Sequence, residues 1–270
     1  MVAIRKVEEY LKKEKERVDR YLYSLLPLRN DSLKEFSESL RYAVFPGGKR
    51  IRPVLLLHLY RLCGGRGNKA LPAAAAIELI HSFSLIQDDL PSMDNDDFRR
   101  GKPSLHRAYK EFTALLASDY LLILAFQELA RHYPAQILCE ATRALGLDGL
   151  TGGQYLDLTF QKKRLSSEIL KEIRTKKTAV LFQLVFRLAA LLAGEDKERV
   201  NLFGKYGLTF GLAFQIRDDL KDESNGESRQ AMNAEIERLT EELTRLENRM
   251  KISSPVLAYF RRFLRSEEAG

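Results

Sequence analysis

Residues 77–97 read IELIHSFSLIQDDLPSMDNDD, an apolar segment that ends in a cluster of aspartates. Apolar side chains recur at three- and four-residue spacing up to Ile86, which predicts a buried helix. Pro91 disfavours helical geometry at the preceding residue, so the helix should end at or before Leu90. Asp88 and Asp89 then lie in its last turn, where the helix dipole is already negative. We therefore expect cationic groups nearby.

A second segment repeats this arrangement. Residues 208–222 read LTFGLAFQIRDDLKD, and Asp218 and Asp222 are four positions apart, so they share a helix face. A single aspartate pair is more often a cap or a solvated turn. Here both pairs end apolar helices, where an unpaired carboxylate is costly. Carboxylates that share a cation with substrate phosphates are typical ligands of Mg²⁺, so the two clusters favour a site where Mg²⁺ clamps a diphosphate.

The remaining sequence is also helical in pattern. Three- and four-residue spacing of apolar side chains recurs in 112–130 and 180–193, and no long stretch alternates as a strand would. The breakers, such as 63–68 and 146–153, are too short to be interdomain linkers. We predict an all-α protein with one domain over residues 1–270. The N-terminus predicts a charged amphipathic helix, not a secretory signal.

Composition narrows the functional classes. The 270 residues are 45% hydrophobic and 30% charged, a typical soluble balance. The longest apolar run, Phe182 to Ala193, is shorter than the roughly 18–20 residues of a membrane-spanning helix. Two cysteines and four histidines show no disulfide framework or zinc-site spacing, which fits a cytoplasmic protein. The net charge of +7 has three possible explanations. The basic residues could belong to a solvated surface, bind nucleic acid, or line a pocket for polyanionic small molecules.

Basic side chains gather where helices should break. Lys49 and Arg52 are three positions apart, Arg99 and Arg100 follow the first aspartate cluster, and 176–178 (KKT) precedes an apolar helix. Arginine binds phosphate oxygens with a planar fork, and lysine adds a point charge. Each group alone is typical of a solvated surface, but together with two aspartate pairs they favour diphosphate binding.

As a set, these segments resemble the trans-isoprenyl diphosphate synthases, the polyprenyl synthetase family, with bacterial farnesyl diphosphate synthases most similar. The matching motifs are GGKRIRP (47–53), LIQDDLPSMDNDDFRRGKPSLH (85–106), GGQYLDL (152–158), KT (177–178) and FQIRDDLKD (214–222), in the family's order. The resemblance implies an antiparallel helical bundle around a central cavity, as a homodimer. It implies a prenyltransferase that joins isopentenyl diphosphate head to tail to dimethylallyl or geranyl diphosphate through an allylic cation.

The resemblance also implies residue roles. The diphosphate of isopentenyl diphosphate would be held by Lys49, Arg52, His81 and Arg100. The allylic diphosphate would be held by Arg99, Lys177, Thr178 and Gln215, while Gln154 and Phe214 would line the reaction centre. About three Mg²⁺ ions per site, with Mn²⁺ possible, would be held by Asp88, Asp94 and Asp218, supported by Asp89, Asp219 and Asp222.

Product length can be argued from helix geometry. If the growing chain runs down the first aspartate helix, a residue five positions before Asp88 lies roughly 7.5 Å deeper, at about 1.5 Å per residue. That residue is Phe83, with Ser84 beside it. A bulky aromatic there would act as a floor, although Phe83 could instead only pack the core. We favour a C15 product, farnesyl diphosphate, over C20 geranylgeranyl diphosphate.

One segment departs from the family. After Asp222 the family continues with a loop of the form GKxxGxDxxxxKxT, whose lysine reaches the allylic diphosphate, and roughly twenty residues of it have no counterpart here. Either the loop is deleted, or the printed sequence omits it. We favour the second account because the other motif residues are intact.

Three rival functions follow from other classes. A catalytically weak partner subunit of a prenyl synthase is favoured by the missing loop and disfavoured by the intact aspartates. A terpene cyclase would need no isopentenyl diphosphate site, so Lys49, Arg52 and Arg100 argue against it. A nucleic-acid binder is disfavoured because no helix-turn-helix or zinc-finger pattern accompanies the positive charge.

Overall fold

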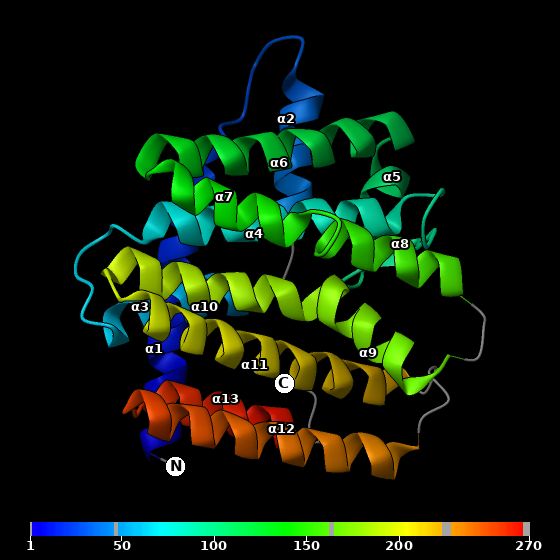
Figure 1. Cartoon of the computed structure of the whole chain (residues 1–270). Coiled ribbons are helices and arrows are strands. Elements are labelled where there is room, and N and C mark those ends of the chain that lie inside the picture. Colours follow the sequence, from blue (N-terminus) through cyan, green and yellow to red (C-terminus); the bar gives the residue numbers. More distant parts are fainter. Residues whose placement is uncertain (1, 46–47, 162–164, 223–227, 267–270) are drawn as a thin grey trace. The chain divides into compact units, whose positions relative to one another are not determined.

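The computed structural model describes residues 2–45, 48–161, 165–222 and 228–266 (Figure 1). They form two compact units. The first unit comprises residues 11–57 and 68–138 and carries Asp88; the second comprises 1–10, 58–67 and 139–270 and carries Asp218. The prediction of one domain over 1–270 stays a prediction.

The described residues form thirteen α-helices, one π-helical turn and one short hairpin. The elements are α1 Val2–Leu25, α2 Lys34–Val44, α3 Ile51–Leu62, α4 Leu71–Asp89, β1 Phe98–Arg99, β2 Lys102–Pro103, α5 Leu105–Ala108, α6 Glu111–His132, α7 Ala135–Leu145, α8 Leu150–Phe160, α9 Ser167–Arg174, η1 Thr175–Ala179, α10 Val180–Ala193, α11 Lys197–Asp222, α12 Arg229–Met250 and α13 Pro255–Arg265. The predicted all-α class is confirmed.

The first unit is built on α4, which packs along α6. Residues 73–76 of α4 are four fully buried alanines, followed by buried Ile77, Leu79 and Ile80. Small side chains allow a close neighbouring helix, and the larger ones that follow fill the core. The helix ends at Asp89, as Pro91 predicted. The two strands then pair Arg99 with Lys102, which makes a tight hairpin of the basic segment.

Helix α1 is tied to α6 by a hydrogen bond within the first unit. The Tyr21 hydroxyl donates to Glu128 Oε2 at 2.8 Å. Glu128 is only 1% exposed, so this contact satisfies a carboxylate that would otherwise be costly to bury.

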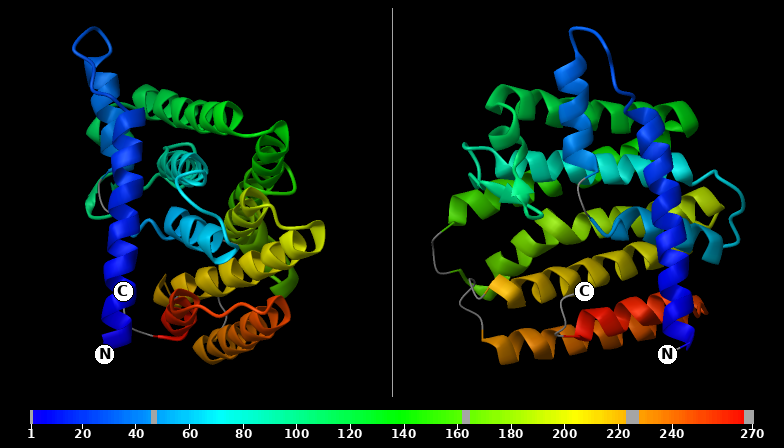
Figure 2. Two further views of the ribbon diagram at one scale, coloured as in Figure 1. Left: turned by 90° about the vertical axis from the view of Figure 1, so that its left-hand side faces the viewer. Right: turned by 180° about the vertical axis from the view of Figure 1, so that it is seen from behind.

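The second unit stacks α10, α11 and α12, which lie side by side in both views of Figure 2. Helix α10 ends at Gly194, whose φ of 86° is left-handed, and a short turn leads into α11. Phe182 and Phe186 of α10 pack against Phe210 and Tyr206 of α11, with ring centroids 5.0 Å apart for Phe186 and Tyr206. These fully buried rings fix α11, and with it the second aspartate motif, against α10.

Helix α6 is a longer apolar segment than the run Phe182 to Ala193, which the sequence pattern indicated as the longest. With 22 residues it is longer than the run at 182–193 and is long and apolar enough to cross a membrane. Half of its most apolar window is buried, and a core helix of a soluble protein passes the same test, so this is weak evidence for a membrane span. Its other face is also apolar, with Phe112, Leu115, Leu116, Tyr120 and Ile123 all exposed.

Candidate active site

The end of α4 folds back on itself. The backbone N–H of Asp94 donates to the carbonyl of Asp88 at 2.9 Å, and that of Met93 donates to Leu90. This turn places the chain at Asp94 beside the last turn of the helix. Both aspartates are half-buried. The sequence spacing of Asp88 and Asp94 therefore becomes a spatial pair.

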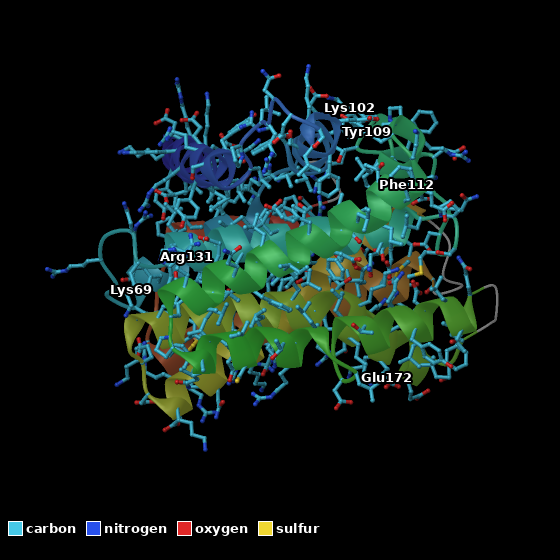
Figure 3. The ribbon with its side chains drawn as sticks, turned by 90° about the horizontal axis from the view of Figure 1, so that it is seen from above. Lys69, Lys102, Tyr109, Phe112, Arg131 and Glu172 are labelled. Atoms are coloured by element: carbon cyan, nitrogen blue, oxygen red, sulfur yellow. The ribbon has the colours of Figure 1, made fainter. Side chains whose placement is uncertain are left out.

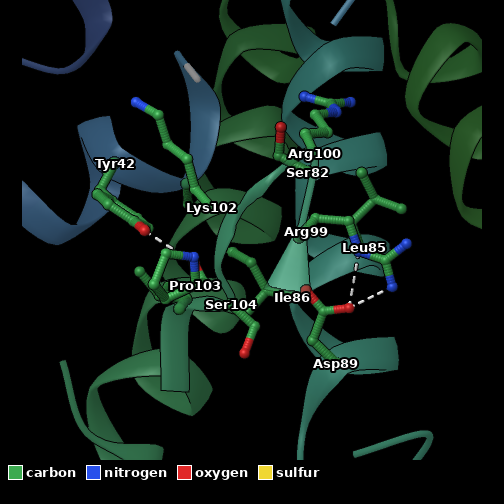
Figure 4. Close-up of a pocket in the computed structure, with 12 residues that line it drawn as sticks. Tyr42, Ser82, Leu85, Ile86, Asp89, Arg99, Arg100, Lys102, Pro103 and Ser104 are labelled. Atoms are coloured by element: carbon green, nitrogen blue, oxygen red, sulfur yellow. Dashed lines mark hydrogen bonds and ion pairs between the residues drawn. The ribbon is translucent and has the colours of Figure 1, made fainter. Parts of the chain in front are cut away.

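Asp89 is held by an arginine (Figure 4). Arg99 Nε donates to Asp89 Oδ1 at 2.8 Å, and its Nη2 bonds both Asp89 and Asp96. Asp89 is 3% exposed. Burial raises the pKa of Asp89, and Arg99 offsets part of that rise. The cation expected from the helix dipole is thus Arg99, and it fixes Asp89 in a supporting position.

The residues assigned to isopentenyl diphosphate converge in the first unit. Arg52 Nη1 lies 3.4 Å from His81 Nε2. A side chain at Gly48 would meet the Arg100 guanidinium, so the loop that carries Lys49 touches the β1–β2 hairpin. Burial, then Arg52 and Arg100, lower the pKa of His81 well below its usual value. The cluster is a cationic surface with a neutral imidazole, suited to an anion.

In the second unit, Asp219 is also held by an arginine. Arg174 Nε donates to Asp219 Oδ2 at 2.7 Å, and the Gln215 amide donates to Oδ1 at 2.7 Å. The Thr178 hydroxyl in turn donates to Gln215 Oε1 at 2.6 Å. This chain of bonds joins the second aspartate motif to the KT motif. Asp218, its neighbour on the helix, is half-buried.

The KT motif lies in η1, a π-helical turn between α9 and α10. Two glycines let neighbouring helices reach this turn. A Cβ at Gly153 would lie 2.3 Å from the backbone nitrogen of Lys177, and one at Gly211 would lie 2.6 Å from the Cα of Ala179. Lys177 Nζ bonds Asp157 of α8 at 2.5 Å. Single π turns are frequent at functional sites, because the extra residue reorients the side chains around it.

The other assigned residues have these places. Gln154 lies on α8, and its Nε2 is buried without a hydrogen-bond partner among the described residues. The Phe214 ring lies 5.1 Å from that of Phe182. Phe83 and Ser84 are half-buried on α4, where the Ser84 hydroxyl donates to the His81 carbonyl at 2.9 Å. Asp222 is the last residue of α11, and its side chain and the segment 223–227, where the family's lysine loop would begin, lie outside the described residues.

The aspartates fit a magnesium site of a particular kind. Among the described residues, no three His, Cys, Asp or Glu side chains are grouped closely enough to cage a metal ion. Mg²⁺ usually binds through one or two carboxylates together with water and substrate phosphates, not through a protein cage. The oxygen donors Asp88, Asp94 and Asp218 suit that habit. Asp88 and Asp218 belong to different units, so their sharing of metal ions stays a prediction.

Comparison with known proteins decides the family. The polyprenyl synthetase family model matches residues 33–234. The chain belongs to the polyprenyl synthetase family. This confirms the resemblance drawn from the motifs.

Its relatives in this family carry several product names. The chain is 38% identical over 212 residues to the heterodimeric geranylgeranyl pyrophosphate synthase large subunit 2 of Arabidopsis thaliana, covering 76% of this chain and 56% of that protein. It is also 38% identical to the farnesyl diphosphate synthase of Geobacillus stearothermophilus, covering 76% and 71%. The apo crystal structure of an FPP/GFPP synthase from Zymomonas mobilis has a TM-score of 0.87 at 30% identity, covering 97% and 98%.

Two residues of this polyprenyl synthetase site are not predicted by the sequence motifs. Arg174 lies three positions before Lys177, outside the KT motif, and binds Asp219. Asp157 lies within the GGQYLDL motif, which predicts no role for it, and it binds Lys177. Charge complementarity to the motif residues was the available signal, but which basic residue meets which acidic one depends on the packing of α8, α9 and α11.

Proposed function

We propose that this protein condenses isopentenyl diphosphate head to tail with dimethylallyl or geranyl diphosphate. The observation that carries the proposal is the cluster of Arg52, His81 and Arg100 around the loop of Lys49, in the same unit as the first aspartate motif. An enzyme that only ionises an allylic diphosphate needs one anion site. A second cationic site in that unit supports a second diphosphate substrate.

The chemistry follows from what these side chains can do. Arg99, Lys177 and Thr178 would hold the allylic diphosphate, and the charges of Arg99 and Lys177 would favour the departing pyrophosphate more than the intact ester. Mg²⁺ held by Asp88, Asp94 and Asp218, when bound, would supply further neutralisation of that charge. The allylic C1–O bond breaks and its electron pair leaves with the pyrophosphate. The isopentenyl double bond then attacks C1 through C4, and a C2 proton passes to the pyrophosphate.

Lys177 would change its partner during this cycle, whereas Arg99 would keep its bonds to Asp89 and bind the diphosphate with its other N–H groups. The Lys177 ammonium donates to Asp157, and the Arg99 guanidinium donates to Asp89 and Asp96. These carboxylates hold both cations in place before substrate arrives. A diphosphate carries more charge than the Asp157 carboxylate, so it competes well for the Lys177 ammonium group.

We propose farnesyl diphosphate as the product, with geranylgeranyl diphosphate as the second candidate. Phe83 lies on α4 on the N-terminal side of Asp88, which supports a floor for a C15 chain. Relatives named for each of these products share about the same identity with this chain, so their names do not separate the two.

We also propose that the protein is a cytoplasmic homodimer. In the first unit, α6 buries one face against α4 and exposes apolar Phe112, Leu116 and Ile123 on another. Figure 3 labels Phe112 and Arg131 at the two ends of this helix. An exposed apolar stripe of this kind, here over residues 112–123 of α6, is typical of a subunit interface.

The test is an assay of the purified protein with Mg²⁺, isopentenyl diphosphate and geranyl diphosphate. We expect pyrophosphate release and an all-trans C15 product, and a longer product from Phe83→Ala. Ionisation of geranyl diphosphate without use of isopentenyl diphosphate would favour a cyclase. No turnover alone, but turnover gained on mixing with an active synthase, would favour a partner subunit.

A further inference from the structure

A buried arginine joins three elements of the first unit. Arg50 lies between Lys49 and Arg52 in the sequence and is 3% exposed. Its Nε donates to Asp19 Oδ1 of α1 at 2.8 Å, its Nη1 to Glu78 Oε1 of α4 at 2.6 Å, and its Nη2 to the Val44 carbonyl of α2 at 2.6 Å. The guanidinium is therefore bonded on all three of its nitrogens.

The charges of this group favour its ionised form. Burial opposes the charge of Arg50, but Glu78 and Asp19 outweigh it, so the pKa of Arg50 is raised. Glu78 is 2% exposed, so Arg50 or Glu78 would be left as a buried charge without an opposite charge if the other were removed. Two carboxylates face one guanidinium here, and the field of Glu78 also favours the charge of Arg100.

The same bonds set the direction of the backbone. Arg50 has a φ of 51°, in the left-handed region that residues with a Cβ seldom adopt. Such a conformation persists where surrounding contacts fix it, and here three contacts do so. The turn leaves Lys49 exposed while Arg52, two residues later, reaches His81.

Glu78 acts on the other side of the cluster. It lies three positions before His81 on α4, so the two share a helix face. Arg50 thus ties the backbone that carries Lys49 and Arg52 to the helix that carries His81, and Asp19 anchors this tie to α1.

We propose that Asp19, Arg50 and Glu78 form a positioning triad, which sets the geometry of the isopentenyl diphosphate site without touching that substrate. The triad rests on the proposed function, because it acts through Lys49, Arg52, His81 and Arg100. It gives α1 a part in substrate affinity.

The test compares three variants, Asp19→Asn, Glu78→Gln and Arg50→Lys, with wild type. Calorimetry measures binding of isopentenyl diphosphate alone, which does not react without an allylic partner, and kinetics gives KM for each substrate. We expect Kd and KM for isopentenyl diphosphate to rise roughly tenfold, as for loss of a charge-assisted hydrogen bond, with KM for geranyl diphosphate within about twofold of wild type. Asp19→Asn is decisive if the others fail to fold, since the Asp19 side chain is 24% exposed.

Tyr21→Phe is the matched control. It removes another tie of α1, to Glu128 of α6, two residues from Asp19. We expect it to lower the Tm without changing affinity for isopentenyl diphosphate. Unchanged affinity in folded Asp19→Asn, or an equal shift in KM for both substrates that Tyr21→Phe reproduces, would overturn the triad. A wild-type protein that binds no isopentenyl diphosphate would overturn the proposed function itself, and the triad with it.

Discussion

The two aspartates of each DD pair have different surroundings. Asp89 and Asp219 are buried and bound by Arg99 and Arg174, whereas Asp88 and Asp218 are half-buried. A buried carboxylate whose oxygens already accept from an arginine is a poor metal ligand, because binding a cation would cost those bonds. From this difference in burial we infer that the more accessible first aspartate of each pair leads in metal binding, and that the second, bound to its arginine, supports the end of the helix.

This difference between the two aspartates predicts different effects of two neighbouring substitutions, one on catalysis and one on stability. Asp218→Asn should lower kcat by about 100-fold or more through weaker metal binding, and should lower the free energy of unfolding less than Asp219→Asn does. Asp219→Asn should lower the free energy of unfolding by about 3 kcal/mol, because it leaves the Arg174 charge without its carboxylate. Urea unfolding and Mg²⁺ titration of activity measure both. Equal unfolding free energies for the two variants would contradict the division.

His81 predicts a dependence of stability on pH. Its native pKa lies well below its usual value, so in the unfolded chain it takes up a proton that the native protein excludes. The contribution of neutral His81 to the free energy of unfolding is complete above about pH 6.5 and is lost progressively as the pH falls below that value. Between pH 7.5 and 5.5, the free energy of unfolding should fall by roughly 1 kcal/mol more for wild type than for His81→Gln. Urea unfolding at the two pH values measures this, and equal slopes would argue against a neutral native His81.

At the scale of elements, α6 is apolar on two faces for two reasons. One face packs on α4, and we propose that the exposed stripe of Phe112, Leu116 and Ile123 contacts a second copy of the chain. Ile123, 62% exposed, has a polar neighbour one turn on, Gln127, which serves as a control position.

A charge on this stripe should separate the subunits. We expect wild type and Gln127→Glu to be dimers by light scattering, and Ile123→Glu to be a monomer at micromolar concentration, because a carboxylate would be buried without a partner. A dimeric Ile123→Glu protein would place the interface elsewhere.

The helices themselves were predictable from periodicity and breakers. Residues 180–193 form α10 as the pattern indicated, and Pro91 ends α4 where expected. The π turn at 175–179 was not predicted, because it depends on Gly153 and Gly211 admitting α8 and α11. Likewise, the glycines of 146–153 predict a break in the helical pattern, yet α8 begins at Leu150 and includes both glycines of the GGQ motif. Close packing between helices, invisible in one sequence, decided both cases.

The same limit applies to the candidate site. The residue types and the motifs that carry Lys49, Asp88, Lys177 and Asp218 were predictable because they follow a family pattern. The partners that hold them, Arg174 and Asp157 among them, were not, because a buried ion pair is set by which helices meet.

At the scale of the whole molecule, the proposed reaction would draw on residues of both units. The first unit contributes Asp88, Asp94 and the cluster of His81, and the second contributes Asp218 and Lys177. In the proposed reaction each unit would hold one end of the metal–diphosphate arrangement, so neither aspartate motif should bind metal and diphosphate tightly without the other.

Paramagnetic resonance titration of Mn²⁺ with inorganic pyrophosphate tests this joint site most directly, in wild type, Asp88→Asn and Asp218→Asn. We predict that wild type takes up several Mn²⁺ ions tightly only with pyrophosphate present, and that either substitution weakens uptake of both metal and pyrophosphate by about tenfold or more. If one substitution left the uptake of Mn²⁺ and pyrophosphate as in wild type, the two aspartate motifs would not share a site.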